Sequence, residues 1–368
     1  MITKTIFPGK YVQGRGAVGL LGQELSTMGA RAIVICDPFV MENALDRLQA
    51  ALAGTVEAEF EKFGGECSDE EIDRLADLAK RKAVSSIAGI GGGKTLDTAK
   101  AVAHELSVPV AVVPTLASTD APCSALSVIY TREGAFKRYL FLPRNPDLVL
   151  VDTDFVVQAP VRFLVSGMGD ALATWFEAES CQKNYAPNMT GQVGSRTGYA
   201  LARLCYDTLL EYGPAAKSSC EAKSITPALE HVVEANTLLS GLGFESGGLA
   251  AAHAIHNGLT VLEETHAFWH GEKVAVGTLA SLFLTDKPKD VIDEAYGFCA
   301  AVGLPTTLAD IGLGDASDDD LSRVAEQACA EGETIHNEPA PVTPDDVVFA
   351  LKCMDREGRR RQALAAAA

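Results

Sequence analysis

Histidines gather in one short part of this sequence, in a pattern that suits metal chemistry. The 368-residue chain holds seven histidines, and four of them fall in the segment AAHAIHNGLTVLEETHAFWHGEKVAVG, far more densely than chance would place them. His253 and His256 are three residues apart, which puts both side chains on one face of a helix. The alternative is that such a histidine only satisfies a hydrogen bond in the core.

An aspartate upstream is a second candidate for chemistry. The segment SGMGDALATW places Asp170 in the first turn of a predicted helix, with no base close to it in sequence. Taken alone, such a residue is more simply interpreted as a helix cap or a satisfied core group. Small residues near the histidines, Gly247, Gly248 and residues 250–252, leave room for a substrate or for close helix packing.

A glycine-rich loop, IAGIGGGKTLDTAK (87–100), is typical of phosphate binding but misses both familiar signatures. The Walker pattern needs glycine at position 88, which is Ala88, and the dinucleotide pattern needs glycine at position 94, which is Lys94. The loop joins a predicted buried strand to a helix, so its amides lie at the carboxyl edge of a parallel sheet, where ligands bind. The alternative is a tight turn that merely packs.

Asp37 directly follows the apolar run RAIVIC, at the end of a predicted strand. An acidic residue there can accept hydrogen bonds from the ribose of NAD, and it would repel the additional phosphate of NADP. Equally, Asp37 could cap the helix that follows. Together, the loop and this aspartate favour a dinucleotide over ATP.

The elements that must position these residues change in character near residue 155. Upstream, short apolar runs alternate with helical segments, which predicts a parallel sheet covered on both faces. Strands are expected at 31–37, 55–63, 84–90, 108–114 and 146–152, and a β-hairpin at 125–143 turning at Glu133-Gly134. Helices are expected at 39–54, at 68–83 with Ser68 as the N-cap and Glu71 at the capping-box position, and at 95–106.

Downstream of residue 155, long Ala- and Leu-rich segments predict a helical bundle. We therefore expect an α/β N-terminal domain, residues 1–158, with a parallel sheet and a dinucleotide site. The second domain, residues 159–368, is expected to be all-α and to bind the metal and the substrate. Two domains are the usual outcome for a chain of this length.

Composition excludes several classes of protein. The net charge of −18 disfavours binding to nucleic acid or to an anionic membrane. The sequence has no apolar signal segment at its start and no run long enough to span a membrane. Nine scattered cysteines without a C-x-x-C pair are most simply reduced cysteines of a cytoplasmic protein.

The segments GIGGGKTLDTAK and VPTLASTDAPCSALSVIY resemble the glycerol dehydrogenase branch of the iron-containing alcohol dehydrogenase and dehydroquinate synthase superfamily. The resemblance extends over nearly the whole chain. It implies that Gly92, Gly93 and Lys94 face the pyrophosphate of NAD. It also implies positions for Thr115 and Ser118 beside the adenosine and its ribose, and for Ser124, Leu126 and Tyr130 along the nicotinamide half.

The same resemblance implies that Asp170, His253 and His270 hold a metal ion. Iron-using members carry a further histidine four residues after the aspartate, where this chain has Thr174. Three protein ligands with an open position are the usual arrangement of catalytic zinc, so we predict zinc rather than iron.

The implied reaction is oxidation of glycerol to dihydroxyacetone, or of a related vicinal diol such as propane-1,2-diol, by hydride transfer to NAD. Zinc would activate the substrate hydroxyl. Asp120 resembles the substrate-contacting aspartate of the family, with an Asx turn as its alternative role. For His256 we expect a supporting role that orients His253, ahead of a role as proton relay.

Four other classes of protein are less consistent with the sequence. A lyase resembling dehydroquinate synthase needs many basic residues for a phosphate and a carboxylate, and few flank ESGGLAAAHAIHNGL or STDAPCSAL. A polyol-phosphate dehydrogenase is disfavoured, less decisively, by the same scarcity of basic residues that disfavours a lyase. A P-loop ATPase is disfavoured by Ala88, and a non-catalytic NAD-binding protein is disfavoured by the complete set of metal ligands.

Members of the family usually form large homo-oligomers, often octamers. The resemblance therefore implies that this protein is a homo-oligomer as well.

Overall fold

The computed structural model describes residues 1–367, and the chain divides into two compact units. The first unit, here called the α/β unit, comprises residues 6–160 and 223–225. The second, the helical unit, comprises residues 1–5, 161–222 and the chain from Thr226 onward. The last residue of the predicted second domain, Ala368, lies outside the described residues. No helix within residues 1–367 is long and apolar enough to cross a membrane.

A parallel sheet forms the centre of the α/β unit. In the described chain it has six strands, in the order β1-β8-β5-β4-β2-β3. The strands are β1 (Tyr11–Gly14), β2 (Arg31–Cys36), β3 (Glu57–Lys62), β4 (Ser86–Gly91), β5 (Val110–Pro114) and β8 (Leu148–Asp152). Residues of β4, β5 and β8 are buried throughout, as expected for strands covered on both faces. The short edge strand β1 is absent from the sequence prediction.

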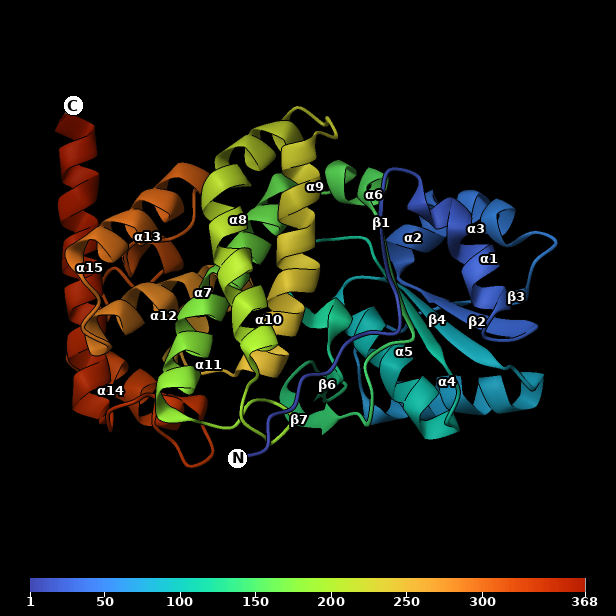
Figure 1. Ribbon diagram of the computed structural model, residues 1–368, viewed down its shortest axis with the longest axis horizontal. Coiled ribbons are helices and arrows are strands. Elements are labelled where there is room, and N and C mark those ends of the chain that lie inside the picture. The colour runs from blue at the N-terminus through green and yellow to red at the C-terminus, as the bar shows by residue number, and fades with distance from the viewer. Residues whose placement is uncertain (368) are drawn as a thin grey trace. The chain divides into compact units, whose positions relative to one another are not determined.

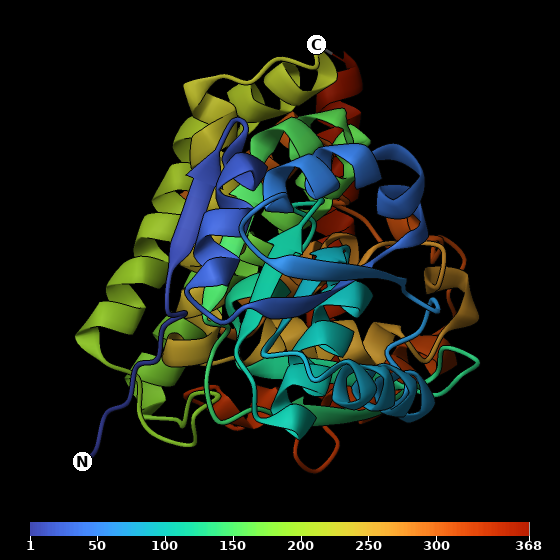
Figure 2. The ribbon, with the colours of Figure 1, turned by 90° about the vertical axis from the view of Figure 1, so that its right-hand side faces the viewer.

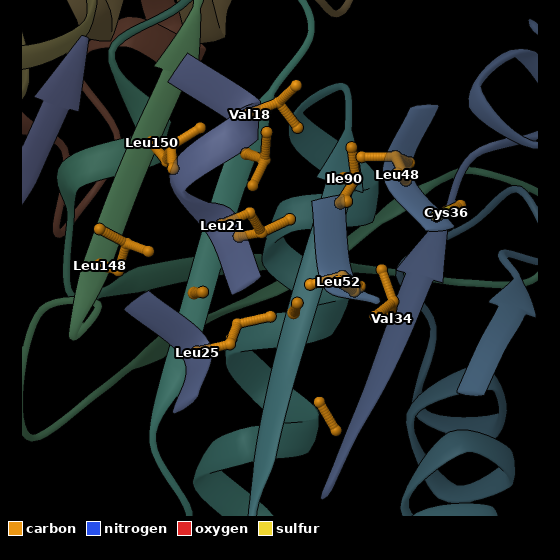
Figure 3. Close-up of a cluster of buried hydrophobic side chains, with 14 of the residues drawn as sticks. Val18, Leu21, Leu25, Val34, Cys36, Leu48, Leu52, Ile90, Leu148 and Leu150 are labelled. Atoms are coloured by element: carbon orange, nitrogen blue, oxygen red, sulfur yellow. The ribbon is translucent and has the colours of Figure 1, made fainter. Parts of the chain in front are cut away.

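Helices cover both faces of this sheet (Figures 1 and 2). On one face lie α1 (Leu21–Ser26), α2 (Pro38–Asn43) and α3 (Leu45–Leu52), and on the other lie α4 (Asp69–Lys82) and α5 (Gly93–Leu106). Figure 3 shows how side chains of α1 and α3 meet the first face. The buried residues in that view include Leu21, Leu25, Leu48, Leu52, Val34, Ile90, Leu148 and Leu150.

The single helix predicted at 39–54 is two helices, α2 and α3. The break is at Ala44, whose backbone lies at φ −133° and ψ −1°, outside the helical region. Each short helix turns its own apolar residue inward, Val40 in α2 and Leu48 in α3. No glycine or proline marks this break in the sequence, and the two helices contribute to the same buried cluster against the sheet.

Two local predictions in this unit are confirmed. Ser68 caps α4 by accepting a hydrogen bond from the Glu71 amide at 3.3 Å, although the Glu71 carboxylate bonds the Gly64 amide at 2.8 Å. The hairpin consists of β6 (Leu126–Tyr130) and β7 (Phe136–Phe141), which pair in antiparallel fashion. Its turn contains Gly134 at φ 86°, a conformation that favours glycine. The unit closes with α6 (Thr153–Gln158).

The helical unit consists of α7 to α15. Their bounds are α7 (Val161–Asn184), α8 (Arg196–Glu221), α9 (Pro227–Glu234), α10 (Ser240–Gly247), α11 (Ala251–Leu259), α12 (His270–Leu284), α13 (Lys289–Val302), α14 (Asp318–Ala328) and α15 (Pro344–Ala367). The prediction that Asp170 lies in the first turn of its helix is wrong. Helix α7 begins at Val161, so Asp170 lies in its interior, fully buried.

Glycines beside the candidate ligands allow α7 and α12 to approach each other closely. A Cβ at position 271, next to His270, would lie 1.7 Å from the main-chain oxygen of Ser166 in α7. A Cβ at Gly169, next to Asp170, would lie 2.3 Å from the Gly271 oxygen. Side chains at these positions would force the helices apart, and with them the candidate ligands.

We therefore expect Gly271→Ala to lower the free energy of unfolding by about 1–3 kcal/mol, the usual cost of overpacking a core. The measurement is urea denaturation followed by circular dichroism. Gly297→Ala in α13 is the matched control, because a Cβ there has no atom within 4 Å and should be neutral or stabilising. An equal effect of the two substitutions would contradict the argument.

Candidate metal centre and cofactor loop

Three candidate ligands converge on one point in the helical unit. The Nε2 atoms of His270 and His253 lie 3.0 Å and 3.3 Å from Oδ1 of Asp170. One ligand atom from each residue lies within 4.8 Å of the others. The residues come from three helices, α7, α11 and α12, and together offer one oxygen and two nitrogens. This donor set suits a divalent metal such as zinc.

The charges of these groups favour a bound cation. Burial would raise the pKa of Asp170, but His270 and His253 outweigh it and hold that pKa well below its ordinary value. Burial would lower the pKa of His253, but the carboxylates of Glu177 and Asp170 raise it well above its ordinary value. Two buried carboxylates thus demand positive charge here, which a proton or a metal ion can supply.

Glu177 contacts the imidazole of His253 at Nδ1, the ring nitrogen that does not face Asp170. Its Oε2 lies 2.6 Å from Nδ1 of His253, and its Oε1 accepts from the amides of Ala250 and His253, both at 2.9 Å. Because an ionised carboxylate only accepts hydrogen bonds, Nδ1 carries a proton. When His253 is neutral, the lone pair is therefore on Nε2, the atom that faces Asp170.

His256 supports His270 in the same way. Its Nε2 lies 3.0 Å from Nδ1 of His270, and its own Nδ1 lies 3.1 Å from Oδ1 of Asn257. Burial, together with His270 and Lys273, keeps the pKa of His256 well below its ordinary value, so the ring is neutral and can accept from His270. The expectation that His256 orients His253 needs correction, because its imidazole contact is with His270.

Glu177 is absent from the site predicted from the sequence. A signal was present, because Glu177 follows Asp170 by seven residues, two turns of α7, and so lies on the same face of that helix. Position 174, where iron-using relatives were expected to carry histidine, supplies no ligand. The buried Thr174 hydroxyl instead lies 2.8 Å from the hydroxyl of Ser240 in α10.

The glycine loop lies in the α/β unit, where the strand order reverses. The chain passes from β2 to β3 on one side and then to β4 on the other, so the carboxyl ends of β2 and β4 flank the switch point. Asp37 follows β2, and Gly92 and Gly93 open α5 after β4. Gly91 has φ 155°, and a Cβ there would lie 2.6 Å from Oδ2 of Asp37.

Asp37 caps helix α2 in this structure. Its Oδ1 accepts from the amide of Val40 at 2.7 Å. Burial raises the pKa of Asp37, although hydrogen bonds from the backbone of Val40, Gly92 and Phe39 oppose this effect. The capping alternative is therefore realised, and a contact with ribose remains a prediction.

The other predicted cofactor residues lie at the start of α5, directly after β5, in the connection that follows and in β6. Lys94 is paired with both carboxylate oxygens of Glu66 at 2.6 Å and lies over the ring of Tyr130. The amide of Thr115 donates to the Gly91 oxygen at 3.0 Å, joining β5 to the loop. Ser118 lies in the connection that follows β5, and Ser124 and Leu126 lie where β6 begins.

Asp120 lies in the connection between β5 and β6, and it is buried. It precedes the short 3-10 helix Ala121–Cys123. In the part of the chain that the structure describes, the Asp120 carboxylate makes no capping hydrogen bond to that helix. The substrate contact of Asp120 and its alternative role in an Asx turn both stay predictions.

Comparison with known proteins identifies the family. The family model of the iron-containing alcohol dehydrogenases matches residues 8–153. The glycerol dehydrogenase of Thermotoga maritima is 68% identical over 99% of this chain and 100% of its own length, and that of Escherichia coli is 54% identical over 96% of each. The solved glycerol dehydrogenase of Schizosaccharomyces pombe is 41% identical, with a TM-score of 0.94 over 99% of this chain and 93% of its own.

The chain therefore belongs to the iron-containing alcohol dehydrogenase family, and it is an oxidoreductase. The relatives named above, which it matches over nearly their whole length, are glycerol dehydrogenases. The fold class expected from the sequence, an α/β unit with a parallel sheet followed by helices, is confirmed by this likeness.

Glu177→Gln should weaken metal binding by about 10- to 100-fold, the usual effect of losing a partner that orients a metal-binding histidine. The glutamine oxygen can still accept from the amides of Ala250 and His253, but its NH₂ group then faces Nδ1. That contact moves the imidazole proton to Nε2 and blocks the ligand atom. Competition with a chromophoric chelator measures the affinity.

Glu338→Gln is the matched control. Glu338 is also buried at the start of α11, where it accepts from the Ala251 amide at 3.0 Å. A glutamine can keep this bond, and the metal affinity should stay close to that of the unsubstituted protein. Equal affinities of the two variants would show that Glu177 does not set the state of His253.

Proposed function

We propose that this protein oxidises glycerol to dihydroxyacetone, with NAD as the hydride acceptor and zinc as the metal ion. The observation that carries the proposal is the convergence of Asp170, His253 and His270, each imidazole presenting Nε2 and held at Nδ1. The names of its relatives, glycerol dehydrogenases at 68% and 54% identity, supply the substrate and the reaction class.

Zinc is favoured over iron by the donor set. Thr174 is bonded to Ser240, so the protein offers two nitrogens and one oxygen and leaves coordination positions open. When bound there, zinc would act as a Lewis acid that lowers the pKa of a substrate hydroxyl, and NAD would accept the hydride from the carbinol carbon.

The protein residues have separate tasks in this proposal. Glu177 and His256 hold the two imidazoles in the state that can bind a metal. Asp120 accepts a hydrogen bond from a polyol hydroxyl, which orients the substrate. Gly92 and Gly93 offer main-chain amides at the start of α5 to the pyrophosphate, since a helix N-terminus carries partial positive charge. Asp37 selects NAD over NADP by charge.

A neutral substrate suits the charges better than a phosphorylated one. The basic residues near the candidate cofactor loop already have partners, Lys94 with Glu66 and Lys100 with Asp97. Few basic residues flank the segments that carry the metal ligands and Asp120, so the lyase alternative, which needs cations for a phosphate and a carboxylate, is disfavoured. Propane-1,2-diol and similar diols remain alternative substrates.

From the family resemblance we also propose that the protein is cytoplasmic and forms a homo-oligomer, an octamer. Light scattering of the purified protein tests the oligomeric state.

Removal and return of zinc tests the reaction as a whole. Protein stripped by a chelator should form no NADH from glycerol and NAD, and added zinc should restore the rate, because hydroxyl activation depends on the metal. Metal analysis of protein prepared without supplements should find zinc. Iron in stoichiometric amount would overturn the metal assignment, and a folded, zinc-loaded, NAD-binding protein inactive on glycerol would overturn the substrate.

Asp120→Ala should raise the KM for glycerol by roughly tenfold, the value of one net hydrogen bond of about 1.4 kcal/mol. Zinc content and NAD affinity should stay unchanged, since Asp120 is assigned to neither. Steady-state kinetics with isothermal titration of NAD separates these effects. An unchanged KM would remove Asp120 from the substrate site.

A further inference from the structure

Helix α5 carries a buried charge pair that the reaction does not use directly. Lys100 is fully buried, and its Nζ lies 2.9 Å from Oδ1 of Asp97, one turn earlier in the helix. The other Asp97 oxygen accepts from the amide of Val128 at 3.0 Å, and the Asp97 carbonyl accepts from the Ser127 hydroxyl. The pair thus joins α5 to the start of the β6–β7 hairpin.

Lys100 also binds the main chain of residues 121–126, the segment that follows Asp120 and ends at the first residue of β6. Its Nζ donates to the main-chain oxygens of Ala121 at 3.1 Å, Ser124 at 3.4 Å and Leu126. Asn145 adds a fourth contact, from Nδ2 to the Cys123 oxygen at 2.9 Å. Buried side chains therefore hold four carbonyls of the stretch 121–126, in addition to the strand contacts that Ala125 and Leu126 make with Leu142 and Phe141.

A contribution to folding stability does not by itself explain why Asp97 and Lys100 are buried as a charged pair. Burying a charge pair costs desolvation, and replacing such a pair with apolar residues is often neutral or stabilising. What the ammonium group does provide is three donors that gather three carbonyls at one point. Helix α5 begins at Gly93, so it also fixes the distance from this point to the glycine loop.

We propose that Asp97 and Lys100 are positioning residues that hold segment 121–126 in register with the glycine loop. This inference rests on the proposed function, in which the glycine loop binds the pyrophosphate and Ser124 and Leu126 lie along the nicotinamide half. The pair then sets the orientation of the nicotinamide ring, while the affinity for NAD depends mainly on the loop. Loss of the pair should slow hydride transfer more than it weakens NAD binding.

The test uses Lys100→Met and the double variant Asp97→Asn/Lys100→Met, in the full-length zinc-loaded protein. The single variant leaves the Asp97 carboxylate without its cation, so it should unfold at a lower temperature; the double variant removes both charges and should recover part of that loss. In both, kcat for glycerol should fall at least tenfold, with the Kd for NAD changed less than threefold. The deuterium isotope effect on kcat, with glycerol deuterated at C2, should rise as hydride transfer becomes limiting.

Arg47→Met is the matched control. It breaks another ion pair of the same unit, Arg47 with the buried Asp152 at 2.5 Å, which does not involve residues 121–126. It should lower stability without changing the isotope effect. A double variant that folds and keeps the kcat and isotope effect of the unsubstituted protein would overturn the proposal.

Hydrogen exchange tests the positioning role of Asp97 and Lys100 without measuring catalysis. NAD should protect the amides of residues 118–128 in the unsubstituted protein, and this protection should fall at least tenfold in the double variant but not in Arg47→Met. Unchanged protection would overturn the proposal. If the unsubstituted protein oxidised no polyol, the proposed function would fail, whereas the exchange result would still support or reject the role of the pair.

Discussion

A carboxylate buried in the middle of a helix must be met by positive charge, and the helical unit is arranged around that constraint at Asp170. Two imidazoles from other helices face the carboxylate, and each is held at its far nitrogen, one by Glu177 and the other by His256. Glycines beside the ligands allow the helices to come close enough for these contacts. A metal ion would replace a proton in an arrangement that is already oriented for it.

A second buried charge organises the α/β unit. Lys100 binds main-chain carbonyls of Ala121, Ser124 and Leu126, while the same helix begins at the glycine loop. Backbone groups in a buried connection must find hydrogen-bond partners, and a lysine ammonium can serve three of them together. In each unit a buried ionised side chain, Asp170 or Lys100, thus holds together segments that are not joined by regular secondary structure.

Much of the fold was predictable because it depends on local patterns. The buried runs at β2, β4 and β5, the Ser68 cap and the hairpin turn near Gly134 follow from residue types within a few positions. The errors arose where distant packing decides. At Ala44 the backbone leaves the helical region while Val40 and Leu48 both join the buried cluster on the sheet, and α7 begins at Val161, which places Asp170 in the interior of the helix rather than in its first turn.

By itself, the sequence determined the residue types available for chemistry, the alternation of strand and helix, and the glycine loop that precedes α5. It also supplied the resemblance that pointed to Asp170, His253 and His270. Only the tertiary structure decided which partner each imidazole has, because Glu177, His256 and Asn257 act through distances of about 3 Å. Hydrogen bonds are that short-ranged, so the pairing of Glu177 with His253, 76 positions further along the chain, is established only once the chain is folded.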